Sequence, residues 1–181
     1  MNKKAKQDNT ALKFIVPLLI VVAVVAIGLF KLVPNITRGS APESSASDLN
    51  PDFAYEVKGS FDIEKLKSYN LPIIIEFGAD WCPPCQQMAP IIKSLNAELQ
   101  GKAIIRYVNV DKVEVKGYNF QSIPTQLFIN ADGSPYVPTQ ASPVAVDMFA
   151  DRDTNEHVYT LHTGVLTREN ILTIFKEMGM E

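Results

Sequence analysis

The chain has 181 residues, of which 46% are hydrophobic and 20% are charged. That length and composition suffice for one globular core with an appendage. The formal net charge of −3 supplies no basic field for phosphate backbones, and lysines cluster only at the extreme N-terminus. We therefore expect one folded domain and no nucleic-acid partner.

The N-terminal segment predicts a membrane anchor over residues 14–33. No charged or strongly polar side chain occurs between residues 14 and 30, a run that spans about 26 Å as a helix. Lys31 can snorkel so that the next two apolar residues complete the span. More lysines precede this run than follow it, which places residues 1–13 in the cytoplasm and the rest of the chain outside it. A cleaved signal peptide is the alternative, but its apolar core is usually only about 7 to 15 residues long.

Residues 34–51 are rich in Ser, Pro, Ala and Asn and have almost no apolar periodicity, which predicts a flexible linker before a folded domain at 52–181. Apolar patterns in the domain predict strands at 53–57, 71–79, 102–110 and 125–130, and a hairpin of 144–149 with 157–164 across 151–156. Helices are predicted after a Ser60 cap, from Pro83 toward Gly101, at 112–119, and from a Thr167 cap to Gly179. This alternation predicts an α/β sandwich with a mixed sheet.

The stretch EFGADWCPPCQQMAP, residues 76–90, contains both cysteines of the chain, Cys82 and Cys85. A zinc site needs about four ligands, and only His157 and His162 could complete one. Their odd offset of five would place them on opposite faces of a strand. We therefore expect both histidines to be ordinary sheet residues with solvent or hydrogen-bond partners, and we expect no metal.

A purely structural disulfide is the second interpretation of the cysteine pair, but so small a loop removes little chain entropy when it is closed. A Cys-x-x-Cys pair that opens a helix after a strand instead favours a thiolate, because free N–H groups and the positive end of the helix dipole lie at the first sulfur. Pro83 and Pro84 have no N–H, so mainly the N–H of Cys85 remains for the Cys82 sulfur. We interpret the pair as a redox centre.

The segments IEFGADWCPPCQQMAP and SIPTQLFIN, with the element order, resemble the thioredoxin superfamily over roughly residues 53–181, and the tether resembles its membrane-anchored extracytoplasmic members. The resemblance implies a thioredoxin-like three-layer sandwich with a redox-active disulfide. In it, Cys82 is the exposed attacking thiol and Cys85 the buried resolving thiol. It also implies a substrate-binding loop in which Pro124 is cis and faces the disulfide, flanked by Ile123 and Thr125.

Glu76 stands where thioredoxins usually carry a buried aspartate, so the resemblance makes it the candidate proton acceptor for Cys85. The alternative is a carboxylate at a strand end with its head in solvent. Trp81 is expected either to shield the disulfide and guide partners or to serve packing alone. Gly78 replaces an aromatic residue of many relatives, which predicts a wider surface near the site, and Pro90 matches the helix-kinking proline of the family.

Residues 134–156 depart from the compact plan of the family, in which the last two strands form a simple hairpin. Two interpretations remain open for this insertion. It is either a partner-recognition flap or an elaborated edge that covers open strand hydrogen bonds.

These features predict a membrane-tethered oxidoreductase that reduces or isomerises disulfides of cysteine-containing extracytoplasmic proteins. The alternatives are a thiol oxidase of the same fold and a tethered binding or chaperone module with incidental cysteines. Because the chain has no nucleotide fingerprint and no second cysteine pair, we expect no cofactor and a separate transmembrane thiol donor. The absence of a cation between the cysteines predicts a potential nearer about −270 mV than about −120 mV.

Overall fold

The computed structural model describes residues 50–181. The predicted cytoplasmic segment 1–13, the predicted anchor 14–33 and nearly all of the predicted linker 34–51 lie outside the described residues. Within residues 50–181, no helix has both the length and the apolar character needed to cross a membrane.

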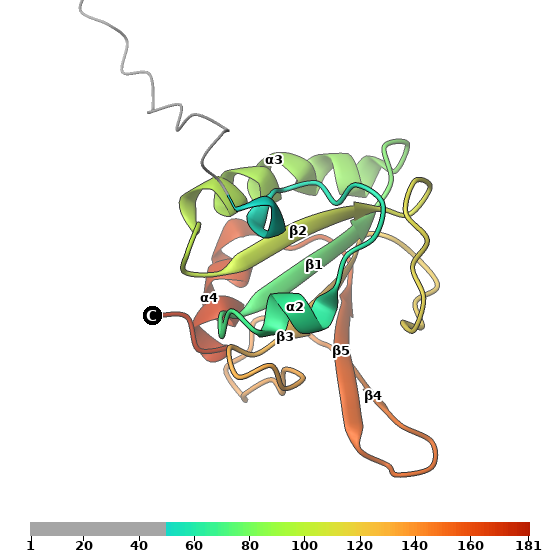
Figure 1. Ribbon diagram of the computed structural model, residues 1–181, viewed down its shortest axis with the longest axis vertical. Helices are drawn as coiled ribbons and strands as arrows, with labels where there is room; N and C mark the ends of the chain where they lie inside the picture. Colours follow the sequence, from blue (N-terminus) through green and yellow to red (C-terminus); the bar gives the residue numbers. More distant parts are fainter. Residues whose placement is uncertain (1–49) are drawn as a thin grey trace, which may run out of the picture. The chain divides into compact units, whose positions relative to one another are not determined.

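A five-stranded mixed sheet forms the centre of the described domain, with the strand order β2-β1-β3-β5-β4 (Figure 1). The strands are β1 (Ile73–Gly78), β2 (Ile104–Asn109), β3 (Thr125–Ile129), β4 (Asp147–Ala150) and β5 (His157–Thr163). β1 and β2 are parallel, whereas each of the other neighbouring pairs is antiparallel. The mixed sheet confirms the predicted fold class.

Helices cover both faces of the sheet and complete a three-layer sandwich (Figure 1). The helical elements are η1 (Pro51–Phe53), α2 (Ile63–Lys67), α3 (Pro83–Glu98) and α4 (Arg168–Glu177). Apolar residues of α3 and α4, among them Met88, Ile92 and Phe175, pack with Ile74 of β1 on one face. Leu66 of α2 packs with residues of β1 that point to the other face.

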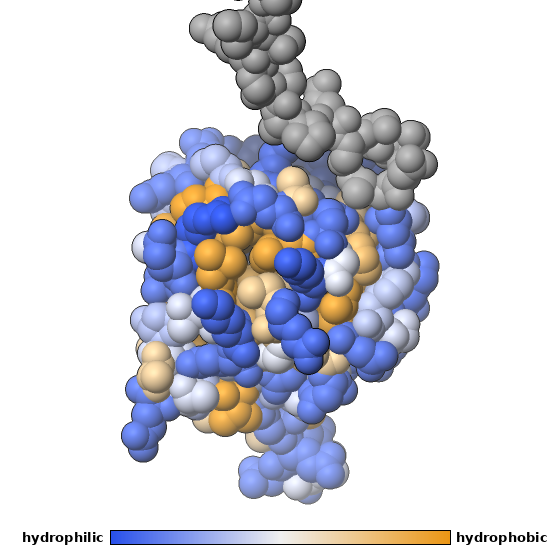
Figure 2. Space-filling view, turned by 90° about the vertical axis from the view of Figure 1, so that its left-hand side faces the viewer, coloured by the Kyte–Doolittle hydropathy of each residue, from blue (hydrophilic) through white to orange (hydrophobic). Residues whose placement is uncertain are grey.

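The sheet is buried on both sides around β1, all six of whose residues are buried. Successive strand residues point to opposite faces, so Ile74, Glu76 and Gly78 share the face that α3 and α4 cover. A glutamate therefore lies within an otherwise apolar layer, directly below the helix that carries the cysteines. Seen from the left of Figure 1, hydrophilic residues surround a central group of apolar residues (Figure 2).

Three predictions of local structure were wrong: the strand at 53–57, the Ser60 cap and the helix at 112–119. In place of a strand at 53–57 the chain forms η1, whose start is fixed by Asn50 accepting the Asp52 N–H, and then only an isolated bridge between Glu56 and Tyr107. The cap of α2 is Asp62, which accepts the Lys65 N–H, rather than Ser60.

The predicted helix at 112–119 is also absent, and this segment is a loop without regular helix or strand. The N–H groups of Lys112 and Val113 both donate to the Asn109 carbonyl, which makes a turn. Gly117, at φ +86°, then lies in the left-handed region and interrupts any helix.

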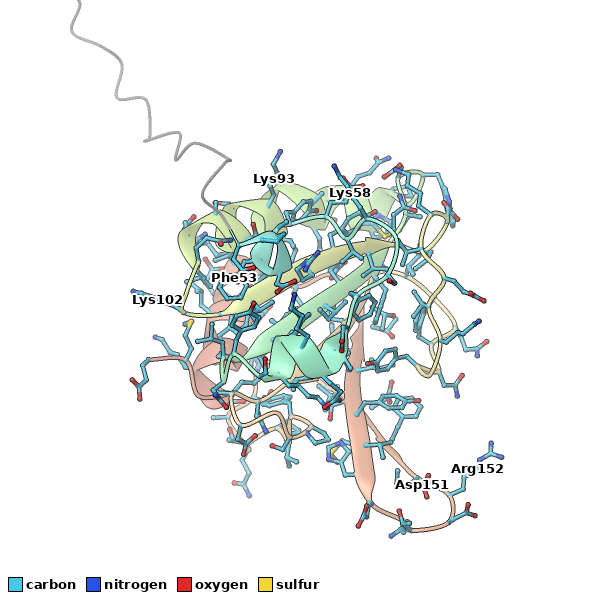
Figure 3. The ribbon with its side chains drawn as sticks, in the orientation of Figure 1. Phe53, Lys58, Lys93, Lys102, Asp151 and Arg152 are labelled. Atoms are coloured by element: carbon cyan, nitrogen blue, oxygen red, sulfur yellow. A yellow bond between two sulfur atoms is a disulfide. The ribbon has the colours of Figure 1, made fainter. Side chains whose placement is uncertain are left out.

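The segment 134–156 contributes to the core and to the edge of the sheet. Tyr136 is buried against Phe128 with an edge-to-face ring contact at 5.7 Å, although the sequence did not single it out. The predicted hairpin is confirmed, because β4 pairs antiparallel with β5. It projects from the domain, with Asp151 and Arg152 at its tip (Figure 3).

Candidate active site

The two cysteines lie at the N-terminus of α3 and form a disulfide, with their Cα atoms 5.2 Å apart. Cys82 is the N-cap residue, and the Cys85 N–H donates to Cys82 Sγ at 3.3 Å. Pro83 and Pro84 occupy the first helical positions, where proline fits without losing a helical hydrogen bond. The Cys85 N–H thus reaches the Cys82 sulfur, as the two prolines predict, and the stabilisation of a Cys82 thiolate by this donor stays a prediction.

The two sulfurs do not differ in exposure as the resemblance implied. Cys82 is only 3% exposed and Cys85 only 5% exposed, because Ala79, Val110 and Ile123 pack around the disulfide. The difference between the cysteines lies in what they face. Cys82 lines an apolar groove, whereas Cys85 lines a separate pocket.

The groove at Cys82, called here the disulfide groove, has a volume of about 490 Å³. Its lining residues are Trp81, Cys82, Pro83, Pro84, Val110, Phe120, Gln121, Ser122 and Ile123. The Ile123–Pro124 peptide bond is cis, as expected, and the Ile123 carbonyl oxygen lies 3.7 Å from Cys82 Sγ. The loop before β3 therefore forms the wall of the groove opposite the N-terminus of α3.

Two residues predicted to act in this region have different settings. Trp81 is 67% exposed and its Nε1–H donates to an Asp111 carboxylate oxygen at 2.8 Å, which holds the indole at the rim of the groove. Thr125 is fully buried, and its hydroxyl donates to the Ser122 carbonyl at 2.7 Å. The Thr125 side chain thus fixes the loop from below instead of lining the groove.

Glu76 is 2% exposed, and neither of its carboxyl oxygens has a hydrogen-bond partner among the described residues. Burial raises the pKa of Glu76 to about 8, which the neighbouring Gln126 amide only partly opposes. The interpretation of Glu76 as a solvated carboxylate at a strand end is therefore wrong. The carboxyl is poised to hold or release a proton near neutral pH.

Gly78 is the link between the Glu76 strand and Cys85. A Cβ atom built on Gly78 would lie 3.4 Å from Cys85 Sγ and 3.0 Å from Cε2 of Tyr107. Tyr107 comes from β2 and stacks on Tyr55 with ring centroids 5.5 Å apart. The expectation of a wider surface at Gly78 was wrong, because the Tyr107 ring occupies that space.

The pocket at Cys85 has a volume of about 360 Å³. Besides Cys85, its lining includes Tyr55, Glu56, Tyr107 and Lys112. Burial is the main cause that raises the pKa of Tyr107 to about 12, so this phenol stays neutral near pH 7. Tyr55 and Tyr107 were not singled out from the sequence, where an aromatic residue in a strand is indistinguishable from a core residue.

The two histidines lie on β5 with local partners. His157 Nε2 is 2.8 Å from the Thr160 hydroxyl, and His162 Nδ1 is 2.8 Å from the Ala145 carbonyl oxygen. Both contacts match the expectation of ordinary sheet residues. The cysteines form their disulfide with each other at the N-terminus of α3.

A disulfide at the N-terminus of a helix, facing a cis-proline loop beside a mixed sheet, defines a dithiol-disulfide exchange site of the thioredoxin fold. The family model described as Thioredoxin matches residues 53–149. The chain belongs to the thioredoxin family, and it is a thiol-disulfide oxidoreductase.

Individual thioredoxins are also similar to this chain. The thioredoxin of Rickettsia bellii is 40% identical over 76 residues, which cover 40% of this chain and 71% of that protein. The thioredoxin of Chlorobaculum thiosulfatiphilum is 35% identical over 101 residues, which cover 55% of this chain and 90% of that protein. Among solved structures, reduced thioredoxin of Schistosoma mansoni is 25% identical with a TM-score of 0.46, covering 68% of this chain and 96% of that one.

Proposed function

We propose that this protein is a membrane-tethered thiol-disulfide oxidoreductase that reduces or isomerises disulfides in extracytoplasmic proteins. The observation that carries the exchange role is the position of the disulfide between two different cavities. Cys82 borders the apolar disulfide groove, where a polypeptide can approach, and Cys85 borders the separate pocket. Cys82 is therefore the attacking sulfur and Cys85 the resolving sulfur.

The reaction begins with the reduced chain, in which Cys82 is a thiolate that accepts the Cys85 N–H. Cys82 Sγ attacks one sulfur of the substrate disulfide, the substrate S–S bond breaks, and the first substrate thiolate leaves. Cys85 then loses its proton and attacks Cys82 Sγ, which breaks the mixed disulfide and releases the second substrate thiolate. The substrate gains two electrons and protons from the medium, and the chain ends as the Cys82–Cys85 disulfide.

Glu76 is the proposed acceptor for the proton of Cys85. Its carboxyl shares a sheet face with Gly78, which lies against Cys85 Sγ, and its raised pKa suits proton transfer near neutral pH. Trp81 and the Ile123–Pro124 peptide are proposed to guide the substrate. The exposed indole covers one side of the groove, and the backbone of Ile123 is available to an extended segment on the other.

The location is proposed from the apolar segment at residues 14–33 and the lysines before it. A domain that reduces disulfides outside the cytoplasm needs two electrons per turnover from a dithiol across the membrane, so a transmembrane thiol donor is the proposed partner. The full-length chain is expected to remain with the membrane fraction after alkaline washing and to lose its domain to external protease. Release by alkali, or protection from external protease, would contradict the proposed topology.

Cysteine variants test the exchange role. Cys82→Ser is expected to abolish reduction of insulin disulfides, because no attacking sulfur remains. Cys85→Ser is expected to accumulate mixed disulfides with extracytoplasmic proteins, because the second displacement cannot occur. Folding assistance that survives intact in Cys82→Ser would instead support a binding or chaperone module.

The direction of exchange is tested by the reduction potential. Pro83 and Pro84 leave the Cys82 thiolate with one nearby backbone donor, so the reduced form lacks the additional stabilisation that makes a strong oxidant. Equilibration with glutathione is expected to give a value nearer the roughly −270 mV of thioredoxin. A value more positive than about −170 mV would identify an oxidase, since even a disulfide isomerase lies near −180 mV.

A further inference from the structure

A second groove lies beside the disulfide groove and is built partly from the extra edge strand. It has a volume of about 380 Å³ and is called here the edge groove. Its lining residues are Asn119, Phe120, Gln121, Ser122, Asp147, Phe149, Leu161 and Thr163. Asp147 and Phe149 belong to β4, the last strand of the sheet order in the described domain. The strand therefore supplies one wall of a cavity as well as an edge.

The two grooves share one short segment of chain as a common wall. Phe120, Gln121 and Ser122 line both of them, and this segment leads directly into the cis Ile123–Pro124 peptide bond. A bound segment that passes over residues 120–122 on its way out of the disulfide groove would reach the edge groove.

Aromatic packing fixes both walls of the edge groove. Phe120 stacks on Phe77 of β1 with ring centroids 5.0 Å apart. Phe149 stacks on Tyr159 of β5 with centroids 4.6 Å apart. Because each wall is tied to a strand of the sheet, the groove exists before any partner binds, which lowers the ordering cost of binding.

The chemistry of the site determines what lies in this groove. During exchange, a substrate cysteine is covalently attached to Cys82 Sγ, so the residues next to it must leave through the disulfide groove. Asp147 is the one charged side chain among the residues that line the edge groove. It is exposed, and a carboxylate in that position attracts a cationic side chain of the bound segment.

We propose that the edge groove binds the substrate polypeptide beside its reactive cysteine and selects segments that place a lysine or arginine at Asp147. This inference rests on the proposed exchange at Cys82. It gives the insertion at 134–156 a role in choosing substrates, with Phe149 contacting the apolar part of the segment. The occupant is an extended polypeptide whose cysteine is the one under attack.

Mixed-disulfide formation provides the test. The full-length Cys85→Ser chain, in detergent and reduced, is mixed with eight-residue peptides whose single cysteine carries a thiopyridine leaving group. Each peptide has either lysine or glutamate at one position, two to five residues before or after the cysteine. At low ionic strength, the lysine peptide is expected to react about five-fold faster than its glutamate counterpart at one or more positions. Equal rates at every position would overturn the inference.

Charge variants identify the groove. With Asp147→Lys added, the preference is expected to reverse, and with Asp147→Asn it is expected to disappear. The matched control is Asp153→Lys, an equal charge reversal in the exposed turn at the tip of the hairpin, where Figure 3 shows its neighbours Asp151 and Arg152. This control is expected to keep the preference for the lysine peptide. If Asp147→Lys and Asp153→Lys lost the preference equally, the net charge of the chain would explain the effect, and the inference would be contradicted.

A small aromatic disulfide tests the exchange role of Cys82 independently of substrate selection by the edge groove. Its reaction with the native chain needs Cys82 but no extended segment. Failure of this reaction would overturn the exchange role at Cys82. A normal reaction with this reagent, together with peptide rates that ignore charge, would overturn the edge-groove inference alone.

Discussion

The setting of Cys82 follows from a few neighbouring residues. The prolines at 83 and 84 start α3 and leave Cys85 as the N–H donor to the sulfur. Ile123 and Val110 cover the disulfide, so a substrate must reach the sulfur from the disulfide groove. At this scale, selectivity depends on the side chains at the rim of that groove.

Trp81 is one such rim residue, and its order depends on Asp111. Asp111→Ala removes the acceptor of the 2.8 Å indole hydrogen bond and is expected to lower the fluorescence anisotropy of Trp81, which is the chain's one tryptophan. A freely rotating indole should also reduce kcat/KM for protein disulfides by about three-fold, since the hydrogen bond that holds the indole at the rim of the groove is lost. Steady-state anisotropy and insulin reduction measure the two effects.

The control for this prediction is Asp80→Ala. Asp80 is adjacent to Trp81 in the sequence, but its carboxylate pairs with Lys112 at 2.9 Å. The anisotropy should therefore stay at the native value in this variant. An equal decrease in both variants would mean that general loosening of the loop, rather than the indole hydrogen bond, controls Trp81.

Most site residues could be predicted because their signals are local. Cys82, Cys85 and their prolines are adjacent in sequence, so helix-capping chemistry sufficed to interpret them. Asp111 and Tyr107 could not be found in this way, since they reach the site through β2 and the turn after it. Only the parallel pairing of β1 with β2 brings that part of the chain beside Gly78.

At the scale of elements, β1 and β2 are in close contact at Gly78. Many relatives have an aromatic side chain at this position of β1, whereas here the ring of Tyr107 from β2 occupies the space. Gly78→Phe is expected to lower the free energy of unfolding by about 2 kcal/mol, because the Tyr107 ring occupies the space that the new side chain needs. Tyr107→Ala alone should also destabilise the chain. The double variant should be more stable than the sum of the single changes predicts, by about 1 kcal/mol or more.

Urea denaturation of the oxidised chain measures this coupling. A second cycle that combines Gly78→Phe with Tyr118→Ala is the control, since Tyr118 packs on the opposite face of the sheet. The control cycle should be additive to within about 0.5 kcal/mol. Additivity in the Tyr107 cycle as well would show that the ring does not occupy the space at Gly78.

The elements predicted correctly are those in which the apolar pattern of the sequence matches the faces that are buried in the fold. The β-branched run at residues 73–75 is buried on both faces, and the apolar stripes of α3 and α4 meet the sheet. The failures at 53–57 and 112–119 have a common cause. Each segment begins with a turn, at Asn50 or at Asn109, whose hydrogen bonds take up the first backbone N–H groups and outweigh a weak apolar periodicity.

At the scale of the whole molecule, the three-layer fold of the described domain buries the carboxyl group of Glu76 without a hydrogen-bond partner. In most of the fold, buried polar groups make hydrogen bonds, as Thr160 does with the Tyr136 carbonyl. Glu76 is different, because both carboxyl oxygens are buried without a partner in the described domain. Such a group lowers the stability of the folded state in exchange for a raised pKa, as is typical of functional sites.

This arrangement predicts how global stability varies with pH. Burial raises the pKa of Glu76 to about 8 in the folded chain, against an ordinary value of 4.5. Between these values the unfolded chain has released the proton while the folded chain still holds it, so the free energy of unfolding falls as pH rises. The loss by pH 8 is expected to be on the order of 4 kcal/mol. Urea denaturation of the oxidised chain from pH 5 to pH 8.5 measures it.

Glu76→Gln removes the titrating group but keeps the shape of the side chain, so the decrease of stability across this pH range should largely disappear. The difference in free energy of unfolding between the variant and the native chain should therefore shift in favour of the variant from pH 5 to pH 8. Glu114→Gln, at an exposed glutamate paired only with exposed Lys116, is the control and should keep the native pH dependence. If Glu76→Gln follows the native curve throughout, Glu76 is already ionised in the folded chain at pH 5. Its pKa would then be ordinary, and the raised pKa that supports its proposed role as the proton acceptor of Cys85 would be absent.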